Sequence, residues 1–208
     1  MLEREVVPEI LDSLPADDPE AVRSRRDLRR IDGLMGNSRW ILSALSELPR
    51  EGDVHELGSG EGGLLGRLAE AGFEAHGYDL APRPLGLPES VGWQQCDLLK
   101  SDDSFHGAVV ASLFLHHFEE ADLAHLGRRL ARADLLAFAE PLRCGLALAG
   151  GYALVPFVGR VTRHDMMVSI RAGFRPGELP RALGLSENWV VEESQTLLGG
   201  YRLLAKRR

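Results

Sequence analysis

A glycine-rich loop between a predicted strand and a predicted helix constrains the fold of this chain more than any other feature. The apolar segment 54–57 leads into Gly58, Gly60 and Gly63, whose spacing matches a G-x-G-x-x-G loop. Glycine permits a tight turn and a close approach of the backbone to a ligand. Apolar residues then recur at helical spacing over 64–69. The sequence therefore predicts a nucleotide-type cofactor loop followed by a helix whose N-terminal amides face the ligand.

An acidic residue two positions before the first glycine indicates which kind of cofactor binds. In a dinucleotide enzyme the loop amides receive a pyrophosphate, which the carboxylate of Glu56 would repel. A carboxylate at this position suits a ligand that carries an ammonium group. The E-x-G-x-G-x-G pattern over 56–62 resembles motif I of class I S-adenosylmethionine-dependent methyltransferases of the small-molecule type, including the quinone-biosynthesis group.

Two further predicted strands also end on acids. The strand at 74–79 ends on Asp79, 21 residues beyond Gly58, where a carboxylate can accept hydrogen bonds from both ribose hydroxyls. The strand at 91–99 carries Asp97, which the resemblance places near the exocyclic amine of adenine, with an apolar neighbour on the ring. Together with the motif, these acids imply S-adenosylmethionine as the cofactor. The implied cofactor-binding residues are Glu56, Gly58, Ser59, Gly60, Gly62, Asp79, Leu80, Asp97, Leu98 and Ser112.

Strands and helices alternate along the chain. Buried strands are predicted at 107–113 and 134–141, with a helix at about 119–131 between them, and a closing antiparallel hairpin is predicted at 189–205. This order predicts an α/β fold with a doubly wound, mainly parallel sheet. The resemblance implies seven strands and a C-terminal antiparallel hairpin, the Rossmann-like fold of class I methyltransferases. Ligands of such sheets bind outside the carboxyl ends of the strands, so we expect the predicted cofactor residues to converge there.

The length of 208 residues, with 44% hydrophobic and 26% charged residues, suits one domain. We divide it into a helical N-terminal arm (1–49), a cofactor-binding core (50–141), an apolar insertion that could cover the substrate (142–185) and the closing hairpin (186–208). Two or three helices are expected in the arm.

Two segments leave their interpretation open. The basic run 23–30 is either a solvated helix face or part of an arm that closes over the cofactor or an acidic substrate. The uncharged run 144–159 is too short and too interrupted to span a bilayer, which needs roughly 20 apolar residues. It is an apolar cover over an aromatic or polyketide-like acceptor, an ordinary buried helix, or a peripheral membrane contact.

The net charge of −7 and the dispersed basic residues argue against nucleic acid as a partner. Two cysteines without a C-x-x-C pair suit a reducing cytoplasm, and the charged N-terminus does not read as a signal peptide. The expected partner is a small-molecule acceptor, and a homodimer is possible.

Histidines near the predicted strand ends are the candidates for acid–base chemistry. The sulfonium methyl group is already activated, so in-line attack mainly requires a well-placed nucleophile, and a general base is optional. The candidate bases are His116 and His117, directly after the strand at 107–113, and His164 further along. We expect no metal, because adjacent histidines rarely aim at one ion and no further cluster of ligands has a recognisable spacing.

The sequence thus predicts a methyltransferase that acts on a small, apolar or aromatic acceptor by O- or C-methylation, as in quinone or polyketide biosynthesis. One alternative is an NAD(P)-dependent oxidoreductase, although no Tyr-x-x-x-Lys site is evident. The other is a non-catalytic cofactor-binding module with the same fold.

Overall fold

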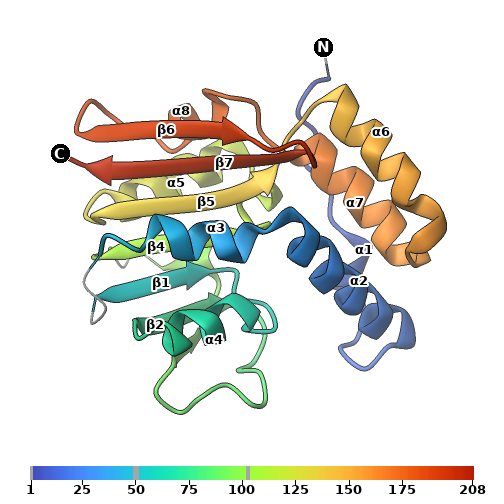
Figure 1. Cartoon of the computed structure of the whole chain (residues 1–208), viewed down its shortest axis with the longest axis horizontal. Helices are drawn as coiled ribbons and strands as arrows, with labels where there is room; N and C mark the ends of the chain where they lie inside the picture. The colour runs from blue at the N-terminus through green and yellow to red at the C-terminus, as the bar shows by residue number, and fades with distance from the viewer. Residues whose placement is uncertain (1, 49–51, 102–103) are drawn as a thin grey trace.

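The computed structural model describes residues 2–48, 52–101 and 104–208 and contains one seven-stranded sheet in the order β3-β2-β1-β4-β5-β7-β6 (Figure 1). The strands are β1 (Asp53–Leu57), β2 (Glu74–Asp79), β3 (Gly92–Gln95), β4 (Ala108–Ser112), β5 (Leu135–Pro141), β6 (Trp189–Gln195) and β7 (Gly200–Arg207). Strands β1 to β5 pair in parallel, and β7 runs antiparallel to both β5 and β6. The predicted sheet and its closing hairpin are confirmed.

Helices cover both faces of the sheet. The α-helices are α1 (Ile10–Ser13), α2 (Pro19–Met35), α3 (Asn37–Ala44), α4 (Gly63–Glu70), α5 (Glu120–Leu130), α6 (Gly145–Leu154), α7 (Arg160–Ala172) and α8 (Glu178–Ala182). Three short 3-10 helices are η1 (Leu98–Lys100), η2 (Leu115–His117) and η3 (Val155–Phe157). Helices α3 and α4 pack on one face and α5 and α8 on the other, each with its own hydrophobic cluster. The sheet is therefore doubly wound.

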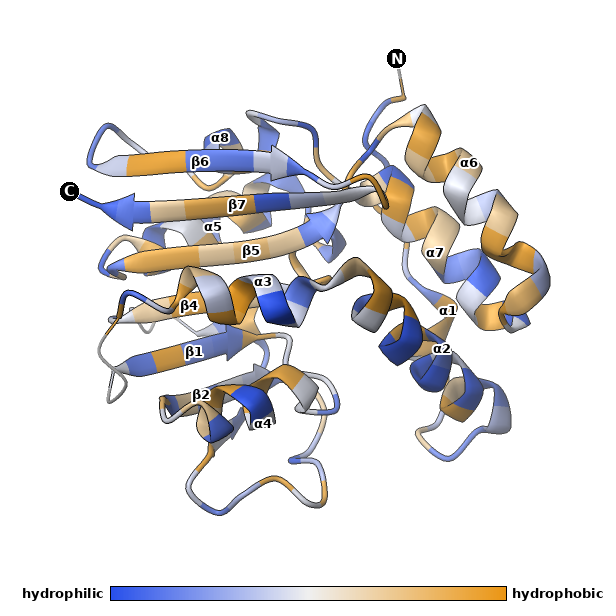
Figure 2. Ribbon diagram, in the orientation of Figure 1, coloured by the Kyte–Doolittle hydropathy of each residue, from blue (hydrophilic) through white to orange (hydrophobic). Residues whose placement is uncertain are grey.

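The centre of the sheet is apolar because both of its faces are covered. All seven residues of β5 are buried, and four of the five residues of β4 are buried. A parallel strand covered on both faces is expected to be continuously hydrophobic, and Figure 2 shows β5 as a mainly apolar strand. The side chains alternate between the two clusters, as Phe138 and Ala139 do.

The N-terminal arm forms α1, α2 and α3, as the periodicity predicted. Asp18 begins α2 by accepting a hydrogen bond from the Glu20 amide at 2.8 Å, with Pro19 in the first helical position. Gly36 ends α2 in the left-handed conformation, at φ 66°, and α3 begins directly after it. Helices α1 and α2 lie beyond the carboxyl ends of the parallel strands and pack on α7 (Figure 1).

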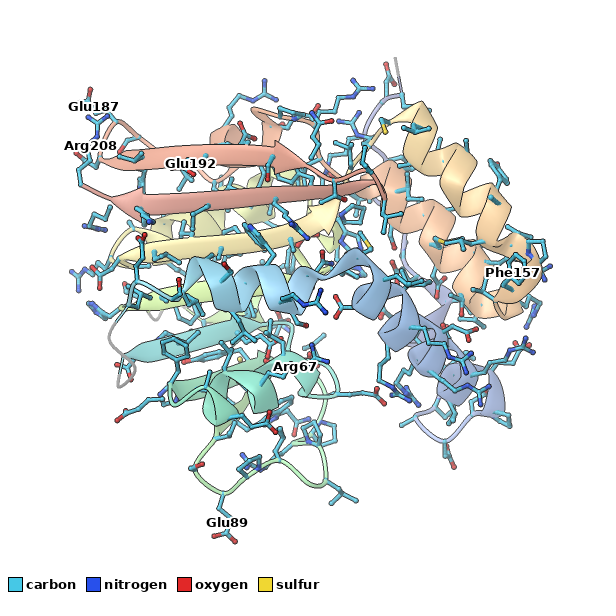
Figure 3. The ribbon with its side chains drawn as sticks, viewed as in Figure 1. Arg67, Glu89, Phe157, Glu187, Glu192 and Arg208 are labelled. Atoms are coloured by element: carbon cyan, nitrogen blue, oxygen red, sulfur yellow. The ribbon has the colours of Figure 1, made fainter. Side chains whose placement is uncertain are left out.

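The sequence pattern alone does not describe the structure of two segments. Strand β3 ends at Gln95 rather than at the predicted Asp97, because the Asp97 carboxylate accepts the Leu99 amide at 3.0 Å and starts η1. The uncharged run 144–159 forms α6, which packs on α7, and η3, which packs on α6, and it leaves the side chains of Leu146 and Tyr152 exposed. Phe157 is 77% exposed at the outer end of this segment (Figure 3).

No helix among the described ranges 2–48, 52–101 and 104–208 is both long and apolar enough to cross a membrane. Helix α6, the most apolar, has only 10 residues.

Candidate active site

The glycine-rich loop lies at the carboxyl end of β1. Gly58, Gly60 and Gly62 all have positive φ values, of 67°, 50° and 74°. A Cβ atom at position 58 would lie 2.1 Å from the Phe114 ring, and one at position 62 would lie 2.8 Å from Leu87. At these two positions glycine is required by both backbone conformation and space. The glycines therefore allow Phe114 and Leu87 to pack closely against the loop backbone.

Asp79 holds the same loop from the end of β2. One carboxylate oxygen accepts the Gly60 amide at 2.8 Å, and the other accepts the Ala81 amide at 2.8 Å. Ser59 adds a second connection, because its hydroxyl donates to the Glu56 carbonyl at 2.9 Å and accepts the Tyr78 amide at 3.2 Å. A carboxylate oxygen has two lone pairs, so Asp79 retains acceptor capacity for ligand hydroxyls.

Glu56 is a buried carboxylate at the end of β1, with 4% of its surface exposed. Burial raises its pKa well above the usual value, and the nearby carboxylates of Asp32 and Asp79 add to the rise. Its Oε2 atom is buried and has no hydrogen-bond partner among the residues that the structure describes. A buried acceptor without a partner is costly, so this atom is suited to a donor supplied by a ligand.

Helix α2 of the arm contacts the cofactor loop. Arg25 and Arg29 form ion pairs with Glu61 of the loop. Asp32 accepts hydrogen bonds from the hydroxyl groups of Ser38 at 3.1 Å and Ser112 at 3.4 Å. Part of the basic run thus pairs with the loop, and closure of the arm over the cofactor or an acidic substrate stays a prediction. Sequence reasoning did not single out Asp32, whose proximity to Ser112 arises from packing between residues 80 positions apart.

The predicted cofactor residues that follow β2 and β3 differ in their contacts and in how exposed they are. Asp97 lies 2.9 Å from the Lys100 ammonium group, and this hydrogen bond and that of the Leu99 amide lower its pKa. Leu98 is 5% exposed in a hydrophobic cluster, whereas Leu80 is 71% exposed beyond β2. Of these two leucines, Leu80 is the one whose side chain is available to a ligand.

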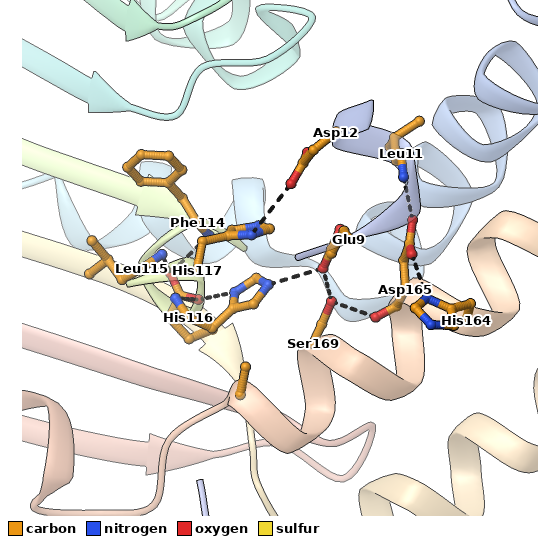
Figure 4. Close-up of polar contacts among 12 residues, drawn as sticks. Glu9, Leu11, Asp12, Phe114, Leu115, His116, His117, His164, Asp165 and Ser169 are labelled. Atoms are coloured by element: carbon orange, nitrogen blue, oxygen red, sulfur yellow. Dashed lines mark hydrogen bonds and ion pairs between the residues drawn. The ribbon is translucent and has the colours of Figure 1, made fainter. Parts of the chain in front are cut away.

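His116 is buried and lies between Glu140 and Glu9, and Figure 4 shows the contact with Glu9. Its Nδ1 atom lies 2.7 Å from Glu140 at the end of β5, and its Nε2 atom lies 3.5 Å from Glu9 of the arm. Glu140 also accepts the backbone amides of Phe114 and Leu115, at 3.1 and 2.8 Å. Burial opposes protonation of His116, but the contacts with Glu140 and Glu9 outweigh it and raise the pKa to about 9.

His117 is more open than its neighbour, with 28% of its side chain exposed. Its Nδ1 atom lies 3.9 Å from Asp12 of α1, and its ring centroid lies 4.3 Å from that of His116. Burial and the charge of His116 lower the pKa of His117. Partial desolvation, with Glu9 and Asp165 nearby, raises the pKa of Asp12 to about 6.

His164 stands apart from the other two predicted histidines, on α7 (Figure 4). Its Nδ1 atom lies 3.0 Å from Asp165, and 47% of its side chain is exposed. The buried Asp165 accepts the Ile10 and Leu11 amides at 2.8 and 3.0 Å and thereby anchors α1. The structure thus brings His116 and His117 together with Glu9 and Asp12 of the arm, which no local sequence pattern indicated.

Models of protein families and curated proteins give no match to this sequence. Solved structures do resemble the fold. The plantazolicin methyltransferase BamL, in complex with a triazolic desmethylPZN analog and SAH, superposes with a TM-score of 0.71 and 11% identity over 95% of this chain and 92% of that chain. Magnesium protoporphyrin IX methyltransferase from Synechocystis, with bound SAH, superposes with a TM-score of 0.55 and 17% identity over 86% of this chain and 83% of that chain. Human N-acetylserotonin methyltransferase, in complex with SAM, superposes with a TM-score of 0.60 and 19% identity over 94% of this chain and 61% of that chain.

The chain therefore has the fold of class I methyltransferases. These neighbours share the fold at low sequence identity, and the chemistry of this chain has to be argued from its own residues.

Proposed function

We propose that this protein transfers the methyl group of S-adenosylmethionine to a small-molecule acceptor. The observation that carries the proposal is the buried, unpartnered Glu56 oxygen directly before a glycine loop at the carboxyl end of β1. Cofactors of doubly wound sheets bind at this end of the strands. Glu56 suits the ammonium group of the cofactor's amino-acid end and would repel a pyrophosphate.

The remaining cofactor contacts follow from the placement of neighbouring side chains. Asp32 lies beside Glu56 and Ser112, so it adds negative charge near the same ammonium group and the sulfonium. Asp79 is the proposed acceptor of the ribose hydroxyls, and the contact between its carboxylate and the Gly60 amide supports this role. Asp97 and Leu80 are the proposed neighbours of adenine.

The acceptor is proposed to bind between the cofactor loop and the arm. Phe114 lies against Gly58, and the Phe118 ring packs edge-on against it with centroids 5.0 Å apart. These rings favour an apolar or aromatic acceptor such as a phenol, quinol or polyketide-like compound. The names of the three neighbours above refer to plantazolicin, magnesium protoporphyrin IX and N-acetylserotonin, and none of the three names refers to a nucleic acid.

Methyl transfer itself requires that the acceptor atom attack the methyl carbon in line with the departing sulfur. The bond from carbon to the acceptor forms as the bond to sulfur breaks, and S-adenosylhomocysteine leaves as a neutral thioether. Holding both reactants in this geometry supplies most of the acceleration, up to about 7–11 kcal/mol in well-oriented systems. The arm, Phe114 and the cofactor loop are the proposed means of holding them.

The proposal is tested by incubating the protein with methyl-labelled S-adenosylmethionine and a panel of phenols, quinols and polyketide-like compounds. Transfer RNA, DNA and a protein mixture serve as the comparison acceptors. We expect label in at least one small compound, and Asp79→Ala should reduce the incorporation. Labelling of a macromolecule with none of the small compounds accepted would contradict the proposed acceptor class.

A further inference from the structure

Three side chains next to the proposed acceptor site hold potential metal-ligand atoms close to one another. A carboxylate oxygen of Glu9 and ring nitrogens of His116 and His117 lie within 4.8 Å of one another (Figure 4). We propose that Glu9, His116 and His117 form a binding site for a divalent transition-metal ion of the zinc type. Sequence spacing argues against such a site, because two adjacent histidines seldom share an ion, but η2 places the centroids of their rings 4.3 Å apart.

His116 has the arrangement of a metal-ligating histidine. Its Nδ1 atom lies 2.7 Å from Glu140, which fixes the ring and leaves Nε2 to face Glu9. Nε2 is buried and lies 3.5 Å from the Glu9 carboxylate, without hydrogen-bond geometry to any described residue, and His116 as a whole is 2% exposed. A bound ion would replace the proton that Glu9 and Glu140 favour on this ring. A carboxylate on the far nitrogen orients metal-bound histidines in general and raises their basicity.

The separation of the ligand atoms suits a bound ion. Zinc binds imidazole nitrogen and carboxylate oxygen at about 2.0–2.2 Å, which places two ligands of a tetrahedral ion about 3.4 Å apart. Nε2 of His116 and Oε1 of Glu9 are 3.5 Å apart. This distance is at the outer limit of a hydrogen bond but matches one edge of such a tetrahedron.

Glu9 and His117, the other two proposed ligands, also contact neighbouring side chains. The Ser169 hydroxyl lies within hydrogen-bond distance of Glu9 Oε1 and of the Asp165 carbonyl oxygen, 2.8 Å away, and its single proton can be donated to either. Asp12 faces His117 from α1, with its Oδ2 atom 3.9 Å from Nδ1, a span that one water molecule can bridge. Glu140 is held by the backbone amides of η2. A site whose ligands are themselves anchored loses little entropy when the ion binds.

Charge around the cluster also favours a cation. Carboxylates of Glu9, Glu140, Asp12 and Asp165 surround the two imidazoles, and Arg4 is directed to the carbonyl groups of His116 and Phe118. Two histidines and one glutamate are a common zinc set that leaves one coordination position open. The partly exposed His117 and Asp12 mark the side from which an ion can enter.

We propose that an acceptor oxygen fills the open position, because His116 and His117 lie on the segment between Phe114 and Phe118, and this part of the inference rests on the proposed function. An acceptor hydroxyl bound there would lose its proton to solvent more readily, because the ion stabilises the oxyanion. That oxygen would then attack the methyl group as the bond between carbon and sulfur breaks.

The chain contains a matched control for metal binding. Asp53, Glu74 and His76 also bring three ligand atoms within 4.8 Å, but both acids are exposed and His76 is only partly buried. No buried orphan nitrogen accompanies this second set among the described residues.

The test is calorimetric titration of the full chain with zinc chloride in the absence of any methyl donor. We expect one strong site per chain. Glu9→Gln and His117→Ala should each weaken zinc binding at least tenfold, and His76→Gln should not. Circular dichroism verifies that the variants fold; because His116 is buried, the test rests on Glu9 and His117 instead. Absence of a strong site, equal affinity in Glu9→Gln and the parent chain, or loss of the site in His76→Gln would each overturn the proposal.

Titration of the same preparation with S-adenosylhomocysteine separates this result from the proposed function. Zinc binding without cofactor binding supports the metal site and contradicts the methyltransferase proposal. Cofactor binding without zinc binding does the reverse.

Discussion

The ring of Phe114 lies directly over the Cα atom of Gly58, so closely that a methyl group on that carbon would come within 2.1 Å of the ring. The contact joins the cofactor loop after β1 to the segment that carries His116 and His117. It therefore connects the proposed cofactor site to the proposed acceptor site.

The first prediction tests this contact. Gly58→Ala should weaken binding of S-adenosylhomocysteine at least tenfold, because the loop must shift or Phe114 must move. Gly60→Ala is the matched control: it also has a positive φ, of 50°, but a Cβ atom there meets nothing within 4 Å. Both variants carry the backbone strain of about 1–2 kcal/mol, so only the difference between them reports the contact. Equal losses in calorimetry would show that the packing of Phe114 is unimportant.

The second prediction concerns Asp79. Asp79→Ala should weaken cofactor binding by about 1.5–3 kcal/mol, since charge-assisted hydrogen bonds to the ribose would be lost. The variant also frees the Gly60 and Ala81 amides, so some of the loss comes from the loop. Asp79→Asn keeps one acceptor oxygen and should lose less. An unchanged dissociation constant in the alanine variant would remove Asp79 from the site.

The third prediction separates the two cofactor classes at Glu56. Glu56→Gln retains the shape but cannot ionise beside the ammonium group of the cofactor, so affinity for S-adenosylmethionine should fall by about tenfold, the value of one lost charged hydrogen bond. The free energy of unfolding should stay the same or rise, because a buried carboxylate without a partner is costly. Should the loop instead receive a pyrophosphate, the same variant would bind NAD more tightly than the parent chain does.

The fourth prediction concerns pH and His55 in β1. Burial and the neighbouring His76 lower the pKa of His55 to about 4. The two rings stack with their centroids 5.2 Å apart. In the unfolded chain this histidine takes up a proton near its usual pKa of about 6.5. The stability that its neutral form provides is therefore fully present above about pH 6.5 and is lost as the pH falls toward 4.

Urea denaturation at several pH values checks this expectation. Between pH 7 and pH 5 the parent chain should lose about 1 kcal/mol more stability than His55→Gln, less than the full shift implies because the ring is partly solvated. A steeper pH dependence in the variant would contradict the assignment.

The core of the fold could be predicted because local patterns decide it. Strands β4 and β5 are continuous apolar runs, the glycine loop has a fixed spacing, and Gly199 and Gly200 mark the turn of the closing hairpin. In each case the residues that determine the conformation are close together in the sequence. Strand β3 was predicted too long because Asp97 forms a local hydrogen bond that competes with the strand.

The arm's part in the site could not be predicted from sequence. Glu9 meets His116, and Asp32 meets Ser112, through packing between segments that are 80 or more positions apart. Helical periodicity indicates that the arm is helical but gives no register against the sheet. For the same reason the convergence of Glu9 with two histidines was not foreseen.

Calorimetric titration with S-adenosylhomocysteine and, separately, with NAD distinguishes the two cofactor classes, because the glycine loop alone is compatible with either. We expect that one S-adenosylhomocysteine binds per chain and that NAD gives no binding heat. Binding of NAD without binding of S-adenosylhomocysteine would contradict this expectation.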